Sequence, residues 1–246
     1  ATLSSDQIRA ISSKAIAGLD ATRISNLTSE QVQSLTTEQV KALTSTALQD
    51  LTSSQVIALT TEQVGALNAS QVAGIDSADL VKMSTEQIVA ISTAAVLGLT
   101  SAQVNQLTTD QIEALTTDQV AKLTTDQIVA LSSIQAPKLS AEQIAALSTV
   151  QVSKLGVDNL KVLSYDAIEA LSVSQAKVLS STQVGALTSS QFRHLSTGAI
   201  GALASDRIVN LTNDQVAAIT TDQVQALTTS QISNLSSSQI QKLTTS

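Results

Sequence analysis

Apolar and polar positions recur along this chain with a period of eight residues. Stepping by eight from Leu3, an aliphatic residue or Met83 occupies each of 31 positions up to Leu243, with no insertion or deletion. Numbered from this residue, the octad consensus is L-[TS]-[TS]-[DE]-Q-[VI]-x-A. Position 6 is Val, Ile or Leu except at Ala136, Ala176 and Phe192. A fixed period of this kind is the sequence pattern of a repeat protein.

Position 2 explains why the period is eight. Ser or Thr stands there in 26 of 31 octads, and Gln follows three residues later, at position 5, in most of them. Ser/Thr-x-x-Gln is a capping box, in which the two side chains bond reciprocally to backbone N–H groups at a helix start. Each octad therefore predicts its own short helix. Capping roles are assigned in the most regular stretch to Thr108, Gln111, Thr116, Gln119, Thr124 and Gln127.

The charged residues agree with this placement of helix starts and ends. Of the 20 acidic residues, 14 stand at position 4, in the expected first turn, and 10 of the 13 basic residues stand at positions 7 or 8. Acidic groups near the start and basic groups near the end of a helix both interact favourably with the helix dipole. The pattern supports a separate helix in each octad.

The octads predict an all-α solenoid. In one long helix, eight residues overshoot two turns by about 80°, so the apolar stripe would spiral away from any single face. In a strand, positions 1 and 6 would point to opposite faces. Short helices must instead stack, burying a continuous core of Leu, Val and Ala. Large and small residues alternate at position 8 between Gln106 and Lys154, which favours about two or slightly more helices per turn. Residues 1–246 are expected to form one continuous solenoid of about 30 repeats.

Composition excludes several classes of protein. The net charge is −7 and only 13% of residues are charged, so the basic face that a nucleic-acid binder needs is missing. No run of about eighteen apolar residues exists, so we expect no membrane insertion. The chain has no Cys, which removes disulfides and thiolate metal sites.

Candidate catalytic chemistry is sparse. His194 is the only His, and its place at position 8 favours a variable helix-end residue over a catalytic base. Carboxylates at position 4, such as Asp110, Asp118 and Asp126, are oxygen ligands that Ca²⁺ accepts, but surface charge that complements the helix dipole is the favoured interpretation. We therefore expect a protein that is not an enzyme and uses no cofactor.

Between residues 134 and 178, apolar residues replace polar ones at positions 3 and 4 of the octads. Repeat drift with scattered surface aliphatics is one interpretation. The other is an apolar surface for lateral association or for an unidentified ligand. The candidate binding residues are Ile134, Val150, Val157, Tyr165 and Val173.

The most regular stretches, residues 107–131 and 219–235, resemble runs in very large secreted bacterial surface proteins of the adhesin-like kind. The resemblance implies an extracellular or cell-surface location and structural or adhesive work. The octad pattern also reaches both ends, at Thr2 and at residues 244–246, so we expect a fragment of a longer array or a filament subunit that self-associates head-to-tail or laterally. Two functions follow as hypotheses: a structural rod or stalk segment, and a scaffold that binds protein or carbohydrate through the 134–178 surface.

Overall fold

The computed structural model describes residues 3–243, whose regular secondary structure is helical throughout and forms two compact units. Residues 1–2 and 244–246 lie outside the described residues. The first unit ends at Ala130 and the second begins at Leu131. The prediction of one continuous solenoid over 1–246 stays a prediction.

The first unit contains fifteen α-helices and one 3₁₀ helix. They are α1 (Ser5–Ala10), α2 (Ser13–Ala17), α3 (Ala21–Ser25), α4 (Ser29–Gln33), α5 (Thr37–Ala42), α6 (Ser45–Gln49), α7 (Ser53–Ala58), α8 (Thr61–Gly65), α9 (Ala69–Gly74), α10 (Ser77–Leu80), α11 (Thr85–Ala90), η1 (Val96–Gly98), α12 (Ser101–Gln106), α13 (Thr109–Ala114), α14 (Thr117–Lys122) and α15 (Thr125–Ala130).

The second unit begins with a 3₁₀ helix and continues with α-helices. They are η2 (Ala136–Lys138), α16 (Ala141–Ala146), α17 (Thr149–Lys154), α18 (Val157–Val162), α19 (Tyr165–Glu169), α20 (Val173–Lys177), α21 (Ser181–Ala186), α22 (Ser189–His194), α23 (Thr197–Ala202), α24 (Ser205–Ile208), α25 (Asn213–Ala217), α26 (Thr221–Ala226), α27 (Thr229–Ser233) and α28 (Ser237–Leu243).

Each described octad holds one helix, as the sequence predicts, because both of its ends are set locally. In α14, Thr116 is extended at φ −70° and ψ 156°, and its hydroxyl accepts the Gln119 N–H. The next position-1 residue, Leu123, is extended again at φ −55° and ψ 137°, which ends the helix. Pro137 lies in one of the two 3₁₀ helices, where the missing N–H of proline cannot support an α-helical bond.

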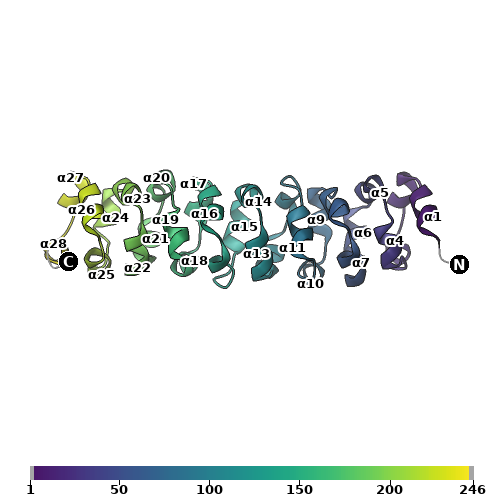
Figure 1. The fold of residues 1–246 in the computed structure, drawn as a ribbon, viewed down its shortest axis with the longest axis horizontal. Coiled ribbons are helices and arrows are strands. Elements are labelled where there is room, and N and C mark those ends of the chain that lie inside the picture. The colour runs from purple at the N-terminus through teal and green to yellow at the C-terminus, as the bar shows by residue number, and fades with distance from the viewer. Residues whose placement is uncertain (1–2, 244–246) are drawn as a thin grey trace. The chain divides into compact units, whose positions relative to one another are not determined.

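The number of helices per turn differs from the prediction. Within each unit, every helix packs against the third helix along the chain, as α2 packs on α5 and α20 on α23. Three helices, or 24 residues, therefore make about one turn, not two or slightly more helices. Figure 1 shows these successive turns within each unit. The alternation at position 8 was misleading because Gln106 and Lys122 are exposed there and report no turn geometry.

Aliphatic side chains at positions 6 and 1 form the core of each unit. Position-6 residues such as Ile112 and Ile168 are completely buried, and position-1 residues such as Leu115 and Leu171 are nearly so. Ala at position 8 was expected to join this core, but Ala114 and most of its equivalents remain partly or fully exposed. Small residues such as Ala at position 8 have a different cause, namely the close contact between successive turns.

Position 3 of one helix lies against position 8 of the third helix after it. The hydroxyl of Ser53 accepts from Lys82 Nζ at 2.7 Å in one such pair. In another, a Cβ added to Gly98 would lie 1.9 Å from the backbone oxygen of Ala69. Turns approach so closely that one member of the pair is usually small. We call this contact a position 3–8 pair.

Candidate functional site

The predicted capping residues form reciprocal hydrogen bonds at three consecutive helix starts. At α14, the Thr116 N–H donates to Gln119 Oε1 at 2.9 Å, and the Gln119 N–H donates to Thr116 Oγ1 at 3.1 Å. The two neighbouring helix starts carry the same pair of bonds, between Thr108 and Gln111 and between Thr124 and Gln127. These groups satisfy N–H donors that a helix start leaves without partners.

The same Gln side chains have a second role that sequence reasoning missed. Gln119 is 1% exposed, and its Nε2 donates to the carbonyl oxygens of Ile88 at 2.9 Å, Val89 at 3.2 Å and Ile91 at 2.8 Å. These carbonyls belong to the end of α11 in the preceding turn. One amide thus caps the start of its own helix with its oxygen and the end of another helix with its nitrogen.

Gln at position 5 makes this contact repeatedly in both units. Its Nε2 bonds to carbonyls 28 and 31 residues earlier, as Gln63 does with Leu35 and Val32, and Gln191 does with Leu163 and Leu160. The acceptors are backbone atoms, so the bonds do not depend on which side chains the neighbouring octads carry. Burial of a neutral amide is tolerated because its donors and its acceptor are all paired.

Other residues at position 5 keep part of this contact. Asn159 Nδ2 donates to the Leu131 carbonyl at 2.8 Å, and Arg207 Nε donates to the Leu179 carbonyl at 3.1 Å. Each of these bonds reaches one carbonyl, whereas most of the Gln side chains, such as Gln119, reach two or three. The position therefore selects for a donor of the length of Gln.

Asp79 is the acidic exception at position 5. Its carboxylate accepts a hydrogen bond from the Ser53 hydroxyl and pairs with Lys82 Nζ at 3.3 Å. Lys82 Nζ also donates to the Ser53 hydroxyl oxygen at 2.7 Å. The cluster therefore links two turns of the first unit.

The five predicted binding residues do not lie on one face. Octads that differ by three share a side of the second unit, so Val150 on α17 shares a side with Val173 on α20. Ile134, in the octad of η2, shares a second side with Val157 on α18, and Tyr165 on α19 lies on the third. The structure thus separates them into two pairs and a single residue. A binding role for each stays a prediction.

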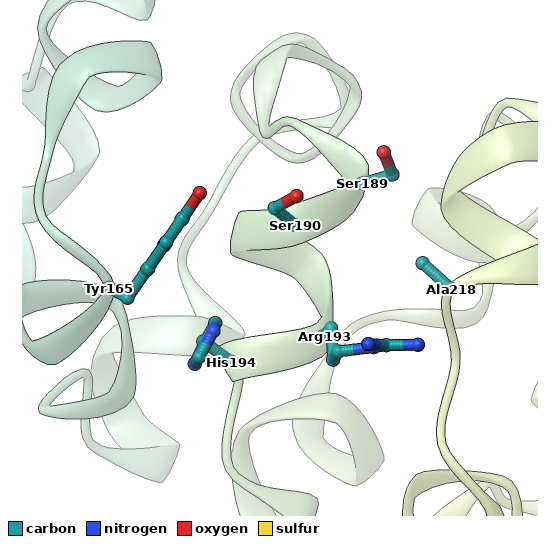
Figure 2. A pocket seen from close by; sticks show the side chains of 6 residues that line it. All are labelled: Tyr165, Ser189, Ser190, Arg193, His194 and Ala218. Carbon is teal, nitrogen blue, oxygen red and sulfur yellow. The ribbon is translucent and has the colours of Figure 1, made fainter.

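Of the five predicted binding residues, Tyr165 stacks on another aromatic ring, that of His194, the only His of the chain. Its ring stacks on the ring of His194 with centroids 4.4 Å apart and planes 8° from parallel. This is a position 3–8 pair between α19 and α22. A shallow hollow of about 340 Å³ adjoins it, and Figure 2 shows the side chains that line it. They are Tyr165, Ser189, Ser190, Arg193, His194 and Ala218.

Sequence reasoning placed His194 only as a variable helix-end residue. His194 follows Tyr165 by 29 residues, which is the separation of a position 3–8 pair. This separation has a meaning only when the turn is known to contain three octads.

The carboxylates at position 4 stand mostly apart. Asp110, Asp118 and Asp126 fall on three consecutive octads and hence on three sides of the first unit. Within residues 3–243, no group of three or more His, Cys, Asp or Glu side chains is arranged to hold a metal ion. None of the described helices has the length and apolar character that a membrane span requires.

Three glutamates at position 4 titrate below their ordinary range. Backbone hydrogen bonding at the helix start lowers the pKa of Glu38, Glu86 and Glu142 below 4.5, and neighbouring hydroxyls lower it further. At Glu142 the hydroxyl of Ser140 donates to Oε2 at 2.8 Å. These exposed carboxylates stabilise helix starts, which agrees with the favoured surface-charge interpretation.

The family model described as ALTTAQ repeat matches five segments that together span more than half of the chain: residues 37–69, 72–109, 98–125, 106–133 and 208–245. No curated protein matches the chain significantly.

Proposed function

The chain belongs to the ALTTAQ repeat family, and from that premise we propose that it is a non-enzymatic structural rod or stalk segment of a secreted bacterial surface protein. The observation that carries the proposal is the Gln amide at position 5, which bonds each turn to the backbone of the turn before. Because backbone acceptors are present in every octad, the scheme extends to any number of repeats. A segment whose length grows by repetition suits a spacer.

Small-angle X-ray scattering of the purified chain tests the rod. A globular protein of this length has a radius of gyration of about 18 Å. The proposal expects a value well above that and a distance distribution with a long tail. A radius near the globular value would refute the rod, whatever the local helix content.

Surface location is part of the same proposal. Its support is the resemblance of residues 107–131 and 219–235 to secreted bacterial surface proteins. Antibodies raised against the chain should label intact cells of the source bacterium. Labelling that appears only after cells are broken would contradict it.

Self-association is also proposed, because aliphatic side chains remain exposed on the described residues. Ile134 is 75% exposed, Val150 58% and Val173 53%, which favours lateral association. An apolar hollow in the first turn, lined in part by Leu3 and Ile11, favours head-to-tail docking. Sedimentation velocity over a wide concentration range should show larger species. A constant monomer at all concentrations would contradict self-association.

A second function, a binding scaffold, is favoured by the hollow beside Tyr165. It gathers a stacked ring pair, a guanidinium and two hydroxyls, where the repeat by itself needs only small side chains. Under this proposal, Tyr165→Ala abolishes ligand binding without lowering helicity. Val157→Ser, on another side of the unit, leaves ligand binding unchanged. A structural rod alone predicts no ligand for either form.

A further inference from the structure

All three ring-bearing side chains of this chain other than proline gather in two neighbouring helices of the second unit. Phe192 is the only Phe, Tyr165 the only Tyr and His194 the only His, and the chain has no Trp. Phe192 on α22 is fully buried in the core of the unit, whereas Tyr165 and His194 stack on each other outside the core. No other position 3–8 pair of the described residues holds two rings, and at Ser45 with Gly74 the approach leaves no room even for a Cβ. Packing of the solenoid therefore does not require the ring pair.

The hollow beside this pair, which we name the Tyr165 hollow, lies over the exposed side of α22. Figure 2 shows Tyr165 and His194 together at one side of that helix, Arg193 extending from the other side toward Ala218, and Ser189 and Ser190 between them. The small Ala218 leaves room where a larger side chain would close the hollow. Its volume of about 340 Å³ lies within the range of about 300–1,000 Å³ that is usual for small-ligand sites.

The charge of the Tyr165 hollow is opposite to that of the chain. The chain has 20 acidic and 13 basic residues, yet the six lining residues include Arg193 and no carboxylate. Among the described residues, no ion pair contains Arg193. A guanidinium in this state can form paired hydrogen bonds with the carboxylate of a ligand.

We propose that the Tyr165 hollow binds an acidic saccharide, that is, a sugar ring that carries a carboxylate. Arg193 pairs with the carboxylate, and Ser189 and Ser190 exchange hydrogen bonds with ring hydroxyls because each Ser hydroxyl both donates and accepts. The half-exposed ring of Tyr165 offers an apolar surface to the C–H groups of the sugar and a phenol hydroxyl at its edge. The inference rests on the binding scaffold, the second proposed function.

A second hollow indicates that more than one sugar ring can be accommodated. It has a volume of about 350 Å³ and is also lined by Tyr165, together with Lys161 and Thr188. Tyr165 therefore borders both hollows, and the lining of each includes a basic side chain, although Lys161 also pairs with Asp158 at 3.8 Å. A plain inorganic anion would use Arg193 alone and leave the ring pair and the hydroxyls without a role, so a charged oligosaccharide matches the lining better.

The composition of the chain makes the test direct. Tyr165 is its only Tyr and Trp is absent, so its intrinsic fluorescence reports on the hollow, and the ring protons of His194 give the only His signals in a proton NMR spectrum. The full chain is titrated with a tetrasaccharide of galacturonate, with the uncharged tetrasaccharide of galactose, and with inorganic phosphate. We expect saturable changes in both signals with galacturonate, and at least about tenfold weaker binding of the other two.

Variants locate the binding. Arg193→Gln should weaken galacturonate binding by at least about tenfold, and Lys177→Gln, which removes an exposed positive charge at the same octad position on another side, should leave it unchanged. Both side chains are exposed, so circular dichroism should show the same helicity in both variants. Tyr165→Leu, followed through His194, should also lose binding.

Several outcomes would overturn the proposal. They are no saturable response to galacturonate, equal binding of the uncharged sugar, equal binding of phosphate, or equal weakening by Lys177→Gln. If galacturonate fails while Tyr165→Ala abolishes capture of another ligand, the scaffold stands and only the saccharide is wrong. If no ligand requires Tyr165 for binding, both the saccharide proposal and the binding-scaffold proposal are wrong.

Discussion

At the scale of the residue, one amide explains why Gln and no other polar side chain dominates position 5. Its oxygen accepts from the N-cap N–H of its own helix, and its two-proton nitrogen bridges carbonyls of the preceding turn. Glu would supply the acceptor without the donors, and Lys the donors without the acceptor. Gln supplies both at the required length. Burial of the amide raises the cost of losing any of these bonds.

Removing this amide should therefore destabilise the chain more than removing the cap opposite it. Thr116→Ala is expected to cost about 1 kcal/mol, the usual value for a lost N-cap. Gln119→Ala removes the reciprocal cap and also takes a hydrogen-bond donor away from the buried carbonyls of Ile88 and Ile91, which adds about 1–3 kcal/mol. Gln33→Ala, at an exposed position 7, should change little. Denaturant unfolding measures all three, and equal losses from Thr116→Ala and Gln119→Ala would show that the contact between turns contributes nothing.

Acid should weaken the helix starts that carry a glutamate. The pKa of Glu142 is lowered in the folded chain, so the stability that its charged form contributes is present above about 4.5 and is lost as pH falls through the folded pKa. Glu142→Gln should remove that part of the acid sensitivity. Thermal midpoints of both proteins between about pH 6 and about pH 3 test this. Parallel pH profiles for the two proteins would contradict the assignment.

How much the sequence predicts at this scale depends on distance along the chain. Thr116 and Gln119 are three residues apart, so local geometry alone identifies them as a cap. The carbonyls of Ile88 and Ile91 are 31 and 28 residues from Gln119, and no local rule connects them. Half of the role of Gln was therefore predictable, and the other half required the number of octads in a turn.

At the scale of the element, close approach between helices of successive turns makes some glycines necessary. A Cβ on Gly98 in η1 would meet the backbone oxygen of Ala69 in α9 at 1.9 Å, and backbone cannot move aside as a flexible side chain can. Gly98→Ala should destabilise the first unit by about 1–3 kcal/mol, the usual cost of overpacking.

A matched control exists in α21 of the second unit. A Cβ on Gly185 would meet nothing within 4 Å, so Gly185→Ala should gain about 0.5–1 kcal/mol from the better helix propensity of Ala. Thermal unfolding of the two variants compares them directly. Stabilisation by both substitutions would mean that η1 and α9 are less closely packed than the structure shows.

Prediction at this scale succeeded for the helices and was wrong for their arrangement. Capping at positions 2 and 5 and the aliphatic residues at positions 6 and 1 predict each helix, because both patterns are local. The number of helices per turn depends on how position 3 of one helix meets position 8 of another, and position 8 alone carries no such information. For the same reason Val150, Val157 and Tyr165, which lie close together in sequence, were expected on one surface but lie on three sides.

At the scale of the whole molecule, the contacts between turns recur at a constant sequence separation of about three octads within each unit. Packing and amide bonds join residues 24 to 31 positions apart in both units, and each octad contacts only its near neighbours. A local defect should therefore spread by one turn and then fade, as in other repeat proteins. A change in the number of octads should instead alter every pairing across the point of change while leaving the core pattern intact.

A deletion of one octad in the second unit tests this step of three. Without residues 171–178, the aliphatic pattern continues unbroken, but Tyr165 and His194 are two octads apart and no longer share a side. Ala202 becomes the position-8 partner of Tyr165, and Val157 becomes the position-3 partner of His194. Deleting residues 195–202 removes the same number of residues after His194 and keeps the ring pair.

The chemical shifts of the His194 ring protons, displaced by the stacked Tyr165 ring, should return toward their usual values in the first deletion and stay displaced in the second. Both proteins should remain helical, since each octad caps its own helix. If His194 stays displaced after the first deletion, three octads do not make a turn, and the sides assigned to every surface residue would have to be redrawn.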